Sequence, residues 1–178
     1  MGEQAWFDDF GEGLDDVQRA FLGELRARAV SWPVEPDDTN LALPGWETYG
    51  PSGPDDFGRL LVWMDVIGEG TALLTVGAYL DGNRVRGDKV HNQLLTLPEK
   101  PTSLAMDVTG SPAELAARTA DWFEGLLRRP IVREEWLADG EVCAHRWSFA
   151  DTGLPLVEGR ARTASLGKPD RVTLVRGD

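Results

Sequence analysis

The side chains that most readily bind transition metals are few in this sequence. Apart from methionine they are His91, Cys143 and His145, and the last two are spaced so that both could face one ion from a single strand. A structural zinc site needs four protein ligands, and a catalytic zinc site needs three and a water. We therefore expect no metal and no cofactor, with a mixed site completed by carboxylates as the open alternative.

Signatures of catalysis are also weak. Residues 151–153 spell the Asp-Thr-Gly triplet of aspartic proteases, but only 25 residues follow it, and this composition at a strand end is typical of a turn. Glu134 and Glu135 are adjacent on a predicted strand, so they point to opposite faces and cannot act together as catalytic carboxylates. We expect cross-strand charge pairing with Arg146 instead. Neither a Gly-x-Ser-x-Gly motif nor a phosphate-binding glycine loop is present in the sequence. The sequence therefore favours a protein that is not an enzyme.

The residues best suited to binding lie near the amino terminus, where aromatic and acidic side chains are interleaved. We take as candidate partner-binding residues Trp6, Phe7, Asp8, Asp9 and Phe10. Carboxylates attract a basic partner, and aromatic rings supply apolar contact area. The alternative is that these rings pack the segment against its own domain.

The net charge is concentrated in the same part of the chain. The formal net charge of the 178 residues is −12; residues 1–58 hold 13 acidic and 3 basic residues, and residues 59–178 hold 17 and 15. This balance opposes binding to nucleic acid or to anionic membranes and favours a basic protein partner. The first nine residues lack the basic and apolar regions of a signal peptide, and no apolar run approaches the length of a membrane span, so we expect a cytoplasmic protein.

Two helices are predicted from capping residues and apolar spacing. The first spans residues 15–29, where Asp15 or Asp16 can accept the backbone N–H groups of the first turn. The second spans residues 112–128, where Ser111 begins a Ser-x-x-Glu capping box and a proline follows it. Both helices carry an apolar stripe that must pack on another layer.

Alternating apolar and polar residues, separated by short turn sequences, predict an antiparallel sheet. The predicted strands are 59–67, 71–80, 88–97, 131–138 and 141–149, with 155–163 and 171–176 as shorter candidates. We expect one α+β domain over residues 1–178, with a sheet of five to seven strands and both helices on one face, in the order α-β-β-β-α-β-β. Residues 1–14 would form an acidic aromatic arm, and the proline- and glycine-rich residues 31–58 an irregular covering loop.

The leading hypothesis is a non-catalytic cytoplasmic protein that binds a basic macromolecular partner through its acidic amino-terminal third. Its order of elements is similar to that of several small bacterial chaperone-like and immunity-protein folds, an analogy of architecture that suggests an adaptor. The alternative is a small-molecule-binding domain or weakly marked enzyme, with a pocket between the sheet and helix 112–128. The residues predicted to line that pocket are Trp63, Trp122, His145 and Trp147. Self-association into a homodimer is a third hypothesis.

Overall fold

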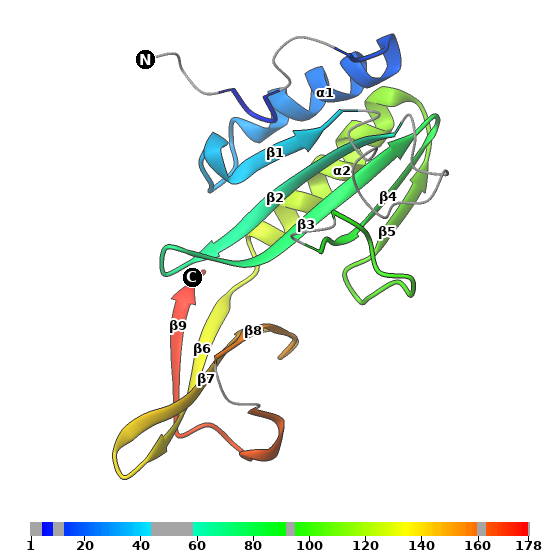
Figure 1. The fold of residues 1–178 in the computed structure, drawn as a ribbon. Helices are drawn as coiled ribbons and strands as arrows, with labels where there is room; N and C mark the ends of the chain where they lie inside the picture. The colour runs from blue at the N-terminus through cyan, green and yellow to red at the C-terminus, as the bar shows by residue number, and fades with distance from the viewer. Residues whose placement is uncertain (1–4, 9–12, 44–58, 92–94, 160–162, 178) are drawn as a thin grey trace. The chain divides into compact units, whose positions relative to one another are not determined.

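The structure is a computed structural model that describes most of the chain (Figure 1). The described residues are 5–8, 13–43, 59–91, 95–159 and 163–177. The predicted α+β class is confirmed, because two α-helices accompany antiparallel β-sheets. Neither described α-helix is long and apolar enough to cross a membrane.

The chain divides into two compact units where the sequence predicts one domain. Unit 1 comprises Met1–Val66 and Thr75–Leu127, and unit 2 comprises Ile67–Leu74 and Arg128–Asp178. The described strands accordingly form a five-stranded and a four-stranded sheet, not one sheet of five to seven strands. Alternation of apolar and polar residues identifies a strand but not the sheet to which it belongs, and this is why the sequence did not separate the two sheets.

The sheet of unit 1 has the strand order β1-β2-β3-β4-β5, and its described pairings are antiparallel. Its strands are β1 (Thr39–Ala42), β2 (Leu60–Gly68), β3 (Thr71–Asp81), β4 (Arg84–Lys89) and β5 (Met106–Thr109). The predicted apolar stripe of β2 is fully buried and consists of Leu60, Val62, Met64 and Val66. Alternate residues of a strand point to opposite faces, so this stripe packs one face of the sheet against the rest of the unit.

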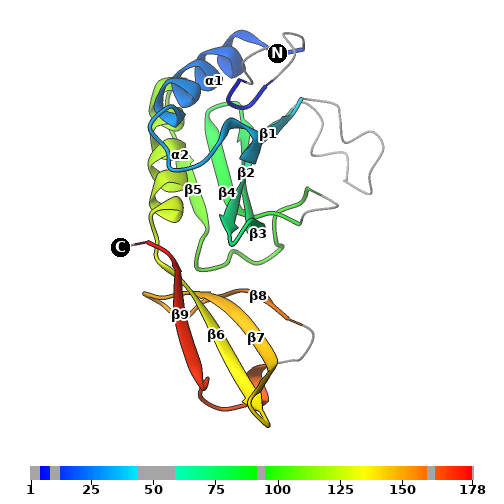
Figure 2. The ribbon, with the colours of Figure 1, turned by 90° about the vertical axis from the view of Figure 1, so that its left-hand side faces the viewer.

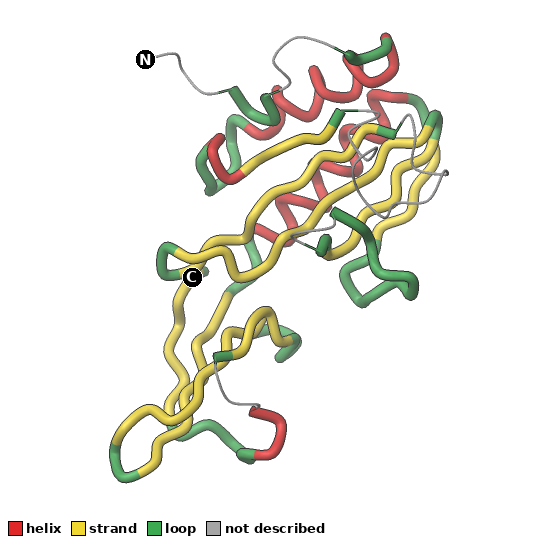
Figure 3. The backbone as a smooth tube through the Cα atoms, viewed as in Figure 1, coloured by secondary structure: helices red, strands yellow, loops and turns green. Residues whose placement is uncertain are grey.

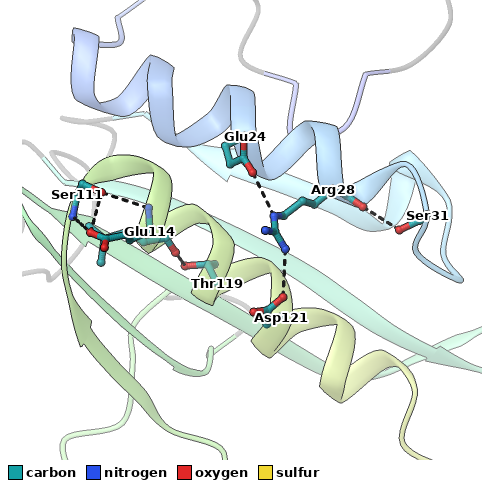
Figure 4. A network of polar contacts seen from close by, with 8 residues as sticks. Glu24, Arg28, Ser31, Ser111, Glu114, Thr119 and Asp121 are labelled. Carbon is teal, nitrogen blue, oxygen red and sulfur yellow. Dashed lines mark hydrogen bonds and ion pairs between the residues drawn. The ribbon is translucent and has the colours of Figure 1, made fainter.

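The helices α1 (Asp16–Ala29) and α2 (Pro112–Leu127) lie close to their predicted bounds. Asp15 caps α1, because its carboxylate accepts the N–H of Gln18 at 2.8 Å while the Gln18 side chain accepts the N–H of Asp15. The predicted capping box of α2 is present as well (Figure 4): the N–H of Ser111 donates to the Glu114 carboxylate at 2.9 Å, and the N–H of Glu114 donates to the Ser111 hydroxyl oxygen at 3.4 Å. Figure 2 shows the two helices beside one another on one side of the five-stranded sheet.

Part of the predicted covering loop is regular structure. The short helix η1 (Pro36–Asp38) and β1 lie within residues 31–58, while residues 44–58 lie outside the described residues. The prediction missed β1 because the strand has four residues and stands among prolines, which cannot donate to a ladder. The third predicted strand, 88–97, is replaced by β4, which begins directly after the turn that follows β3.

Unit 2 contains the four-stranded sheet with the order β8-β7-β6-β9 (Figure 3). Its strands are β6 (Ile131–Ala138), β7 (Glu141–Phe149), β8 (Pro155–Glu158) and β9 (Arg171–Arg176), and the short helix η4 spans Thr163–Ser165. The predicted two-residue turn joins β6 to β7, and its residues Asp139 and Gly140 have φ values of 53° and 84°. The turn residues Asp139-Gly140 adopt positive φ more readily than other types, so the hairpin forms where the sequence places it.

Candidate functional site

The amino-terminal arm packs its rings into its own unit. Phe7 is fully buried, with its ring centroid 6.1 Å from that of Trp32 and 6.2 Å from that of Phe123. The half-buried Trp6 meets Trp32 edge-on at 6.1 Å. The ring of Phe7 therefore belongs to the core of unit 1 and is not available to a partner, as the second of the two interpretations expects. Asp9 and Phe10 lie outside the described residues.

The arm is also held through its backbone. The guanidinium of Arg26, on α1, donates from Nε to the carbonyl of Trp6 at 2.9 Å and from Nη2 to the carbonyl of Phe7 at 2.5 Å. The backbone N–H of Phe7 in turn donates to Oγ1 of Thr39 on β1 at 3.1 Å. These three hydrogen bonds tie one short stretch of arm to both a helix and a strand.

The Phe7–Thr39 hydrogen bond connects two stretches of backbone that are far apart in the sequence and that both carry acidic residues. Asp8 follows Phe7, and Asp38 precedes Thr39 at the end of the turn that also holds Glu35 and Asp37. Asp8, Glu35 and Asp37 are exposed and Asp38 is half-buried. We refer to Asp8, Glu35, Asp37 and Asp38 as the acidic corner.

The other arginines of the amino-terminal third form ion pairs elsewhere on the helices. Arg19 pairs with Asp16 at 2.6 Å, one turn along α1. Arg28 pairs with Glu24 at 3.2 Å and with Asp121 of α2 at 3.2 Å (Figure 4). Their positive charges are therefore compensated by carboxylates that are not members of the acidic corner.

The net charge of the protein belongs entirely to unit 1. By sequence this unit holds 21 acidic and 9 basic residues, a formal net charge of −12, whereas unit 2 holds 9 of each. The acidic corner therefore lies in a unit whose overall field is negative. A field of this sign attracts basic molecules and repels nucleic acid.

Two of the four predicted pocket residues lie on opposite faces of the sheet of unit 1. A Cβ atom on Gly87 would lie 3.0 Å from the Trp122 ring, and one on Gly77 would lie 3.0 Å from Cβ of Trp63. Gly77 is paired with Asp88, the neighbour of Gly87, so the two glycines point to opposite faces. Trp63 and Trp122 therefore do not line a common pocket.

The other two pocket candidates belong to unit 2. His145 and Trp147 meet edge-on with ring centroids 4.8 Å apart, and Nε1 of Trp147 donates to Glu69 at 2.9 Å. A Cβ atom on Gly159 would lie 2.6 Å from the His145 ring, so this residue's backbone lies directly against the ring. The four predicted residues are thus divided between the two units, with Trp63 and Trp122 in unit 1 and His145 and Trp147 in unit 2.

A shallow depression of about 210 Å³ does occur on unit 1, beside the start of α2. It is lined by Val108, Thr109, Glu114 and Arg118. The hydrogen bonds of Glu114 to Ser111 cap the helix and hold the pKa of the Glu114 carboxyl below its usual value. This carboxylate therefore has a structural role at the helix start and is not poised to accept a proton.

The three soft metal ligands are not gathered in one unit. His91 is in unit 1, and Cys143 and His145 are in unit 2. Cys143 is the extra residue of a β-bulge in β7, where it is exposed and its thiol donates to the carbonyl of Trp136 at 3.3 Å. Within the described residues, no three His, Cys, Asp or Glu side chains are grouped so as to hold a metal ion.

The adjacent acids of β6 are structural and point to opposite faces, as predicted. Glu134 accepts hydrogen bonds from Arg146 at 2.7 and 3.1 Å and from the hydroxyl of Ser148 at 2.7 Å, and these donors lower its pKa. Glu135 is buried and pairs with Arg133 at 3.0 Å and with Arg171 at 3.1 Å. The pairing of Glu134 with Arg146 confirms the cross-strand expectation, whereas the role of Arg171 depends on the β6–β9 pairing and left no local signal in the sequence.

The Asp-Thr-Gly triplet is a turn after β7. The carboxylate of Asp151 accepts hydrogen bonds from Arg129 at 2.9 and 2.8 Å, which lower the pKa of this carboxyl, and Gly153 has a φ of 68°. Arg129 also lies 3.8 Å above the ring of Phe149. The triplet therefore anchors a turn through an ion pair and does not present a catalytic carboxylate.

Comparison with known proteins adds no relative from which a function could be inferred. No protein-family model, curated protein or solved structure matches this chain. The acidic corner is therefore the candidate functional site. Three of its four members, Glu35, Asp37 and Asp38, were not predicted as site residues, although the run of acids after Val34 is visible in the sequence.

Proposed function

We propose that the protein is a non-catalytic cytoplasmic binding protein, an adaptor of the immunity-protein or chaperone-like kind, that uses the acidic corner to engage a basic macromolecular partner. The observation that carries the proposal is that an aromatic ring is buried here while the neighbouring acids are exposed. The ring of Phe7 is buried, while the carboxylates of Asp8, Glu35 and Asp37 are exposed. The aromatic residue fastens the segment, and the acids remain at the surface.

Exposed carboxylates of this kind act mainly on the encounter between partners. Each of them keeps its hydration, so a single surface pair contributes at most about 1 kcal/mol. Several carboxylates on one corner of a unit with negative net charge add to a common field, which raises the association rate and selects partners by charge. Affinity for such a partner should therefore fall as salt increases.

The decisive experiment compares two double charge reversals that leave the protein with the same net charge. Glu35→Lys/Asp37→Lys alters the acidic corner, and the control Glu99→Lys/Glu141→Lys alters two exposed acids outside it. Both change the formal net charge from −12 to −8, because each reversal adds two charges. A lysine-rich peptide serves as the basic probe, and its Kd is measured by isothermal titration calorimetry or fluorescence anisotropy.

We expect the corner variant to bind the probe about tenfold more weakly than the control variant at about 10 mM salt, where the Debye length is about 30 Å. The difference should vanish at about 300 mM salt, where the Debye length is below about 10 Å. Equal weakening by the two variants would show that the net charge of the protein, and not the acidic corner, determines binding. That result would contradict the proposal.

A further inference from the structure

The strands at the ends of the two sheets differ in how well they are protected against pairing with another chain. β1, β5 and β8 have four residues each, β5 carries the exposed charge of Asp107, and β8 begins with Pro155, which has no N–H to donate. β9 has six residues and no proline, and its charged residues stand only at its two ends. Because shortness, charge and proline protect the edge of a sheet, β9 is the least protected of these four strands.

β9 lies at the end of the four-stranded sheet, where β6 is its neighbour on one side (Figure 2). Within the described part of the chain no strand pairs with its other side, so alternate N–H and C=O groups of its backbone point away from the sheet. Residues 171–174 are all exposed. The outer side of β9 can therefore form the hydrogen bonds of one more strand.

The exposed centre of β9 is also apolar. Val172 is 57% exposed and Leu174 is 53% exposed, and the two lie on one face of the sheet because they are two positions apart. Among the described residues of unit 2 they are the two most exposed large apolar side chains. A strand that pairs with β9 would therefore cover apolar area as well as bind backbone groups.

The sequence of β9 is complementary to itself in the antiparallel direction. With a two-fold axis at Thr173, Val172 of one copy stands opposite Leu174 of the other, and the symmetry repeats this contact on the other side of the axis. Cross-strand apolar pairs of this kind stabilise a sheet. Each exposed apolar side chain of β9 is thus covered by its counterpart in a second copy.

The same register matches the charges at the two ends of the interface. Arg176 of one copy approaches Asp170 of the other, so opposite charges meet there. Arg171 stands opposite Val175, so no guanidinium group faces another. Unit 2 holds 9 acidic and 9 basic residues, and two copies of it therefore bring no net charge to the contact. This complementarity selects a second copy of the chain as the partner of β9.

We propose that the protein forms a homodimer in which β9 pairs with β9 of a second copy, so that two four-stranded sheets join into one. The inference uses no residue of the acidic corner and is independent of the proposed function. The pairing is short, so the dimer is weak. Two copies that each carry a net charge of −12 repel one another at long range, so salt should strengthen the dimer, whereas it weakens binding to a basic partner.

The test measures the dimer Kd of the full chain by sedimentation equilibrium, at protein concentrations up to about 500 µM and at about 10 and 300 mM salt. Val172→Lys/Leu174→Lys places two charges in the proposed interface, and the control Val17→Lys/Val30→Lys places two at exposed apolar positions of unit 1. Both variants change the formal net charge from −12 to −10, because each lysine adds one charge. We expect the Kd of the β9 variant to be at least about tenfold higher than that of the control.

A second measurement needs only the wild-type protein. Hydrogen exchange of residues 171–174 should slow at least about threefold when the protein concentration is raised from about 5 to about 500 µM, because the dimer protects the outer amides of β9. Exchange in β7, which has a neighbouring strand on each side, should not depend on concentration.

Three results would overturn the inference. A wild-type protein that stays monomeric at about 500 µM in high salt does not form the dimer. Equal Kd values for the β9 variant and the control would place the contact elsewhere on the chain. If the β9 variant does not fold, wild-type exchange decides, and exchange of residues 171–174 that is independent of concentration excludes the pairing.

Discussion

Unit 1 and unit 2 differ in how they use their aromatic and charged side chains. In unit 1 the rings of Phe7, Trp32 and Phe123 pack against one another, and the uncompensated charge lies at the surface. In unit 2 the aromatic rings lie against guanidinium groups, with Arg129 over Phe149 and Arg133 near Trp147. The carboxylates of unit 2 pair with the same class of residue, and its formal charge is balanced.

This contrast indicates which unit has charge available for binding. A guanidinium that is paired with a carboxylate and stacked on a ring has few free donors, so the charges of unit 2 mainly hold its sheet together. Unit 1 also uses some carboxylates, because Asp15 and Glu114 cap its helices and Asp121 pairs with Arg28, but its acidic residues outnumber its basic ones by 21 to 9. The acids in excess can therefore serve an external partner without loss of the fold.

The largest expected effect is on the packing of unit 1. Phe7→Ala should lower the free energy of unfolding by about 3–5 kcal/mol, because it removes a fully buried ring and leaves a cavity. Chemical denaturation measures this loss, with hydrogen exchange reporting faster opening in α2 than in β7. The exposed control Val30→Ala should change stability by less than about 0.5 kcal/mol. If Phe7→Ala were as stable as this control, the arm would not be part of the core of unit 1.

The second effect concerns the buried carboxylate of unit 2. Glu135→Gln should lower the free energy of unfolding by about 1–3 kcal/mol, because two guanidinium groups lose their charged partner while remaining partly exposed to water. Denaturant unfolding tests this against Glu141→Gln, a change at an exposed acid of the same strand pair. Equal stability of the two variants would mean that apolar packing, as in unit 1, is what holds unit 2.

A third and smaller effect is the acid sensitivity contributed by Glu134. Hydrogen bonds from Arg146 and Ser148 lower the pKa of this carboxyl below its ordinary value of 4.5. Between the two pKa values the unfolded chain binds more protons than the folded chain, so stability falls as the pH falls from about 4.5 toward the folded value. The melting temperature should therefore fall less steeply between pH 6 and about pH 3 for Glu134→Gln than for the wild type. If the melting temperature depended on pH in the same way in both proteins, Glu134 would not contribute to the acid sensitivity.

The smallest effect is expected at the exposed ion pair between α1 and α2. Asp121→Asn removes the partner of Arg28 at a site where both side chains are well exposed, so stability should change by less than about 0.5 kcal/mol. Thermal unfolding at low and high salt checks this value. A loss as large as that of Glu135→Gln would show that charge pairing stabilises unit 1 as much as unit 2.

Local features of the fold could be predicted from the sequence, and long-range ones could not. Asp15 and Ser111 cap their helices, and Asp139 and Gly140 form their turn, because these effects act within a few residues of the chain. The division of strands between two sheets depends on pairings such as that of β6 with β9, which join residues more than thirty positions apart. Period-two alternation is the same in either sheet and carries no information about that choice.

The candidate site shows the same limit. The mixture of rings and acids at residues 6–10 identified the arm but did not say which side chains would turn inward. One hydrogen bond between Phe7 and Thr39 connects the backbone of the arm to that of the residues after Glu35, and no spacing in the sequence predicts it. Self-association likewise remains a prediction, with the exposed Val172 and Leu174 of β9 as the apolar side chains that it would cover.

The most direct measurement of the central claim is an NMR titration of the ¹⁵N-labelled protein with the lysine-rich peptide. We predict that the largest shift changes fall on residues 6–8 and 35–39, that they disappear at high salt, and that the β6–β7 hairpin of unit 2 is unaffected. Shift changes of equal size at Asp139 and Glu141, or changes that persist at high salt, would contradict it.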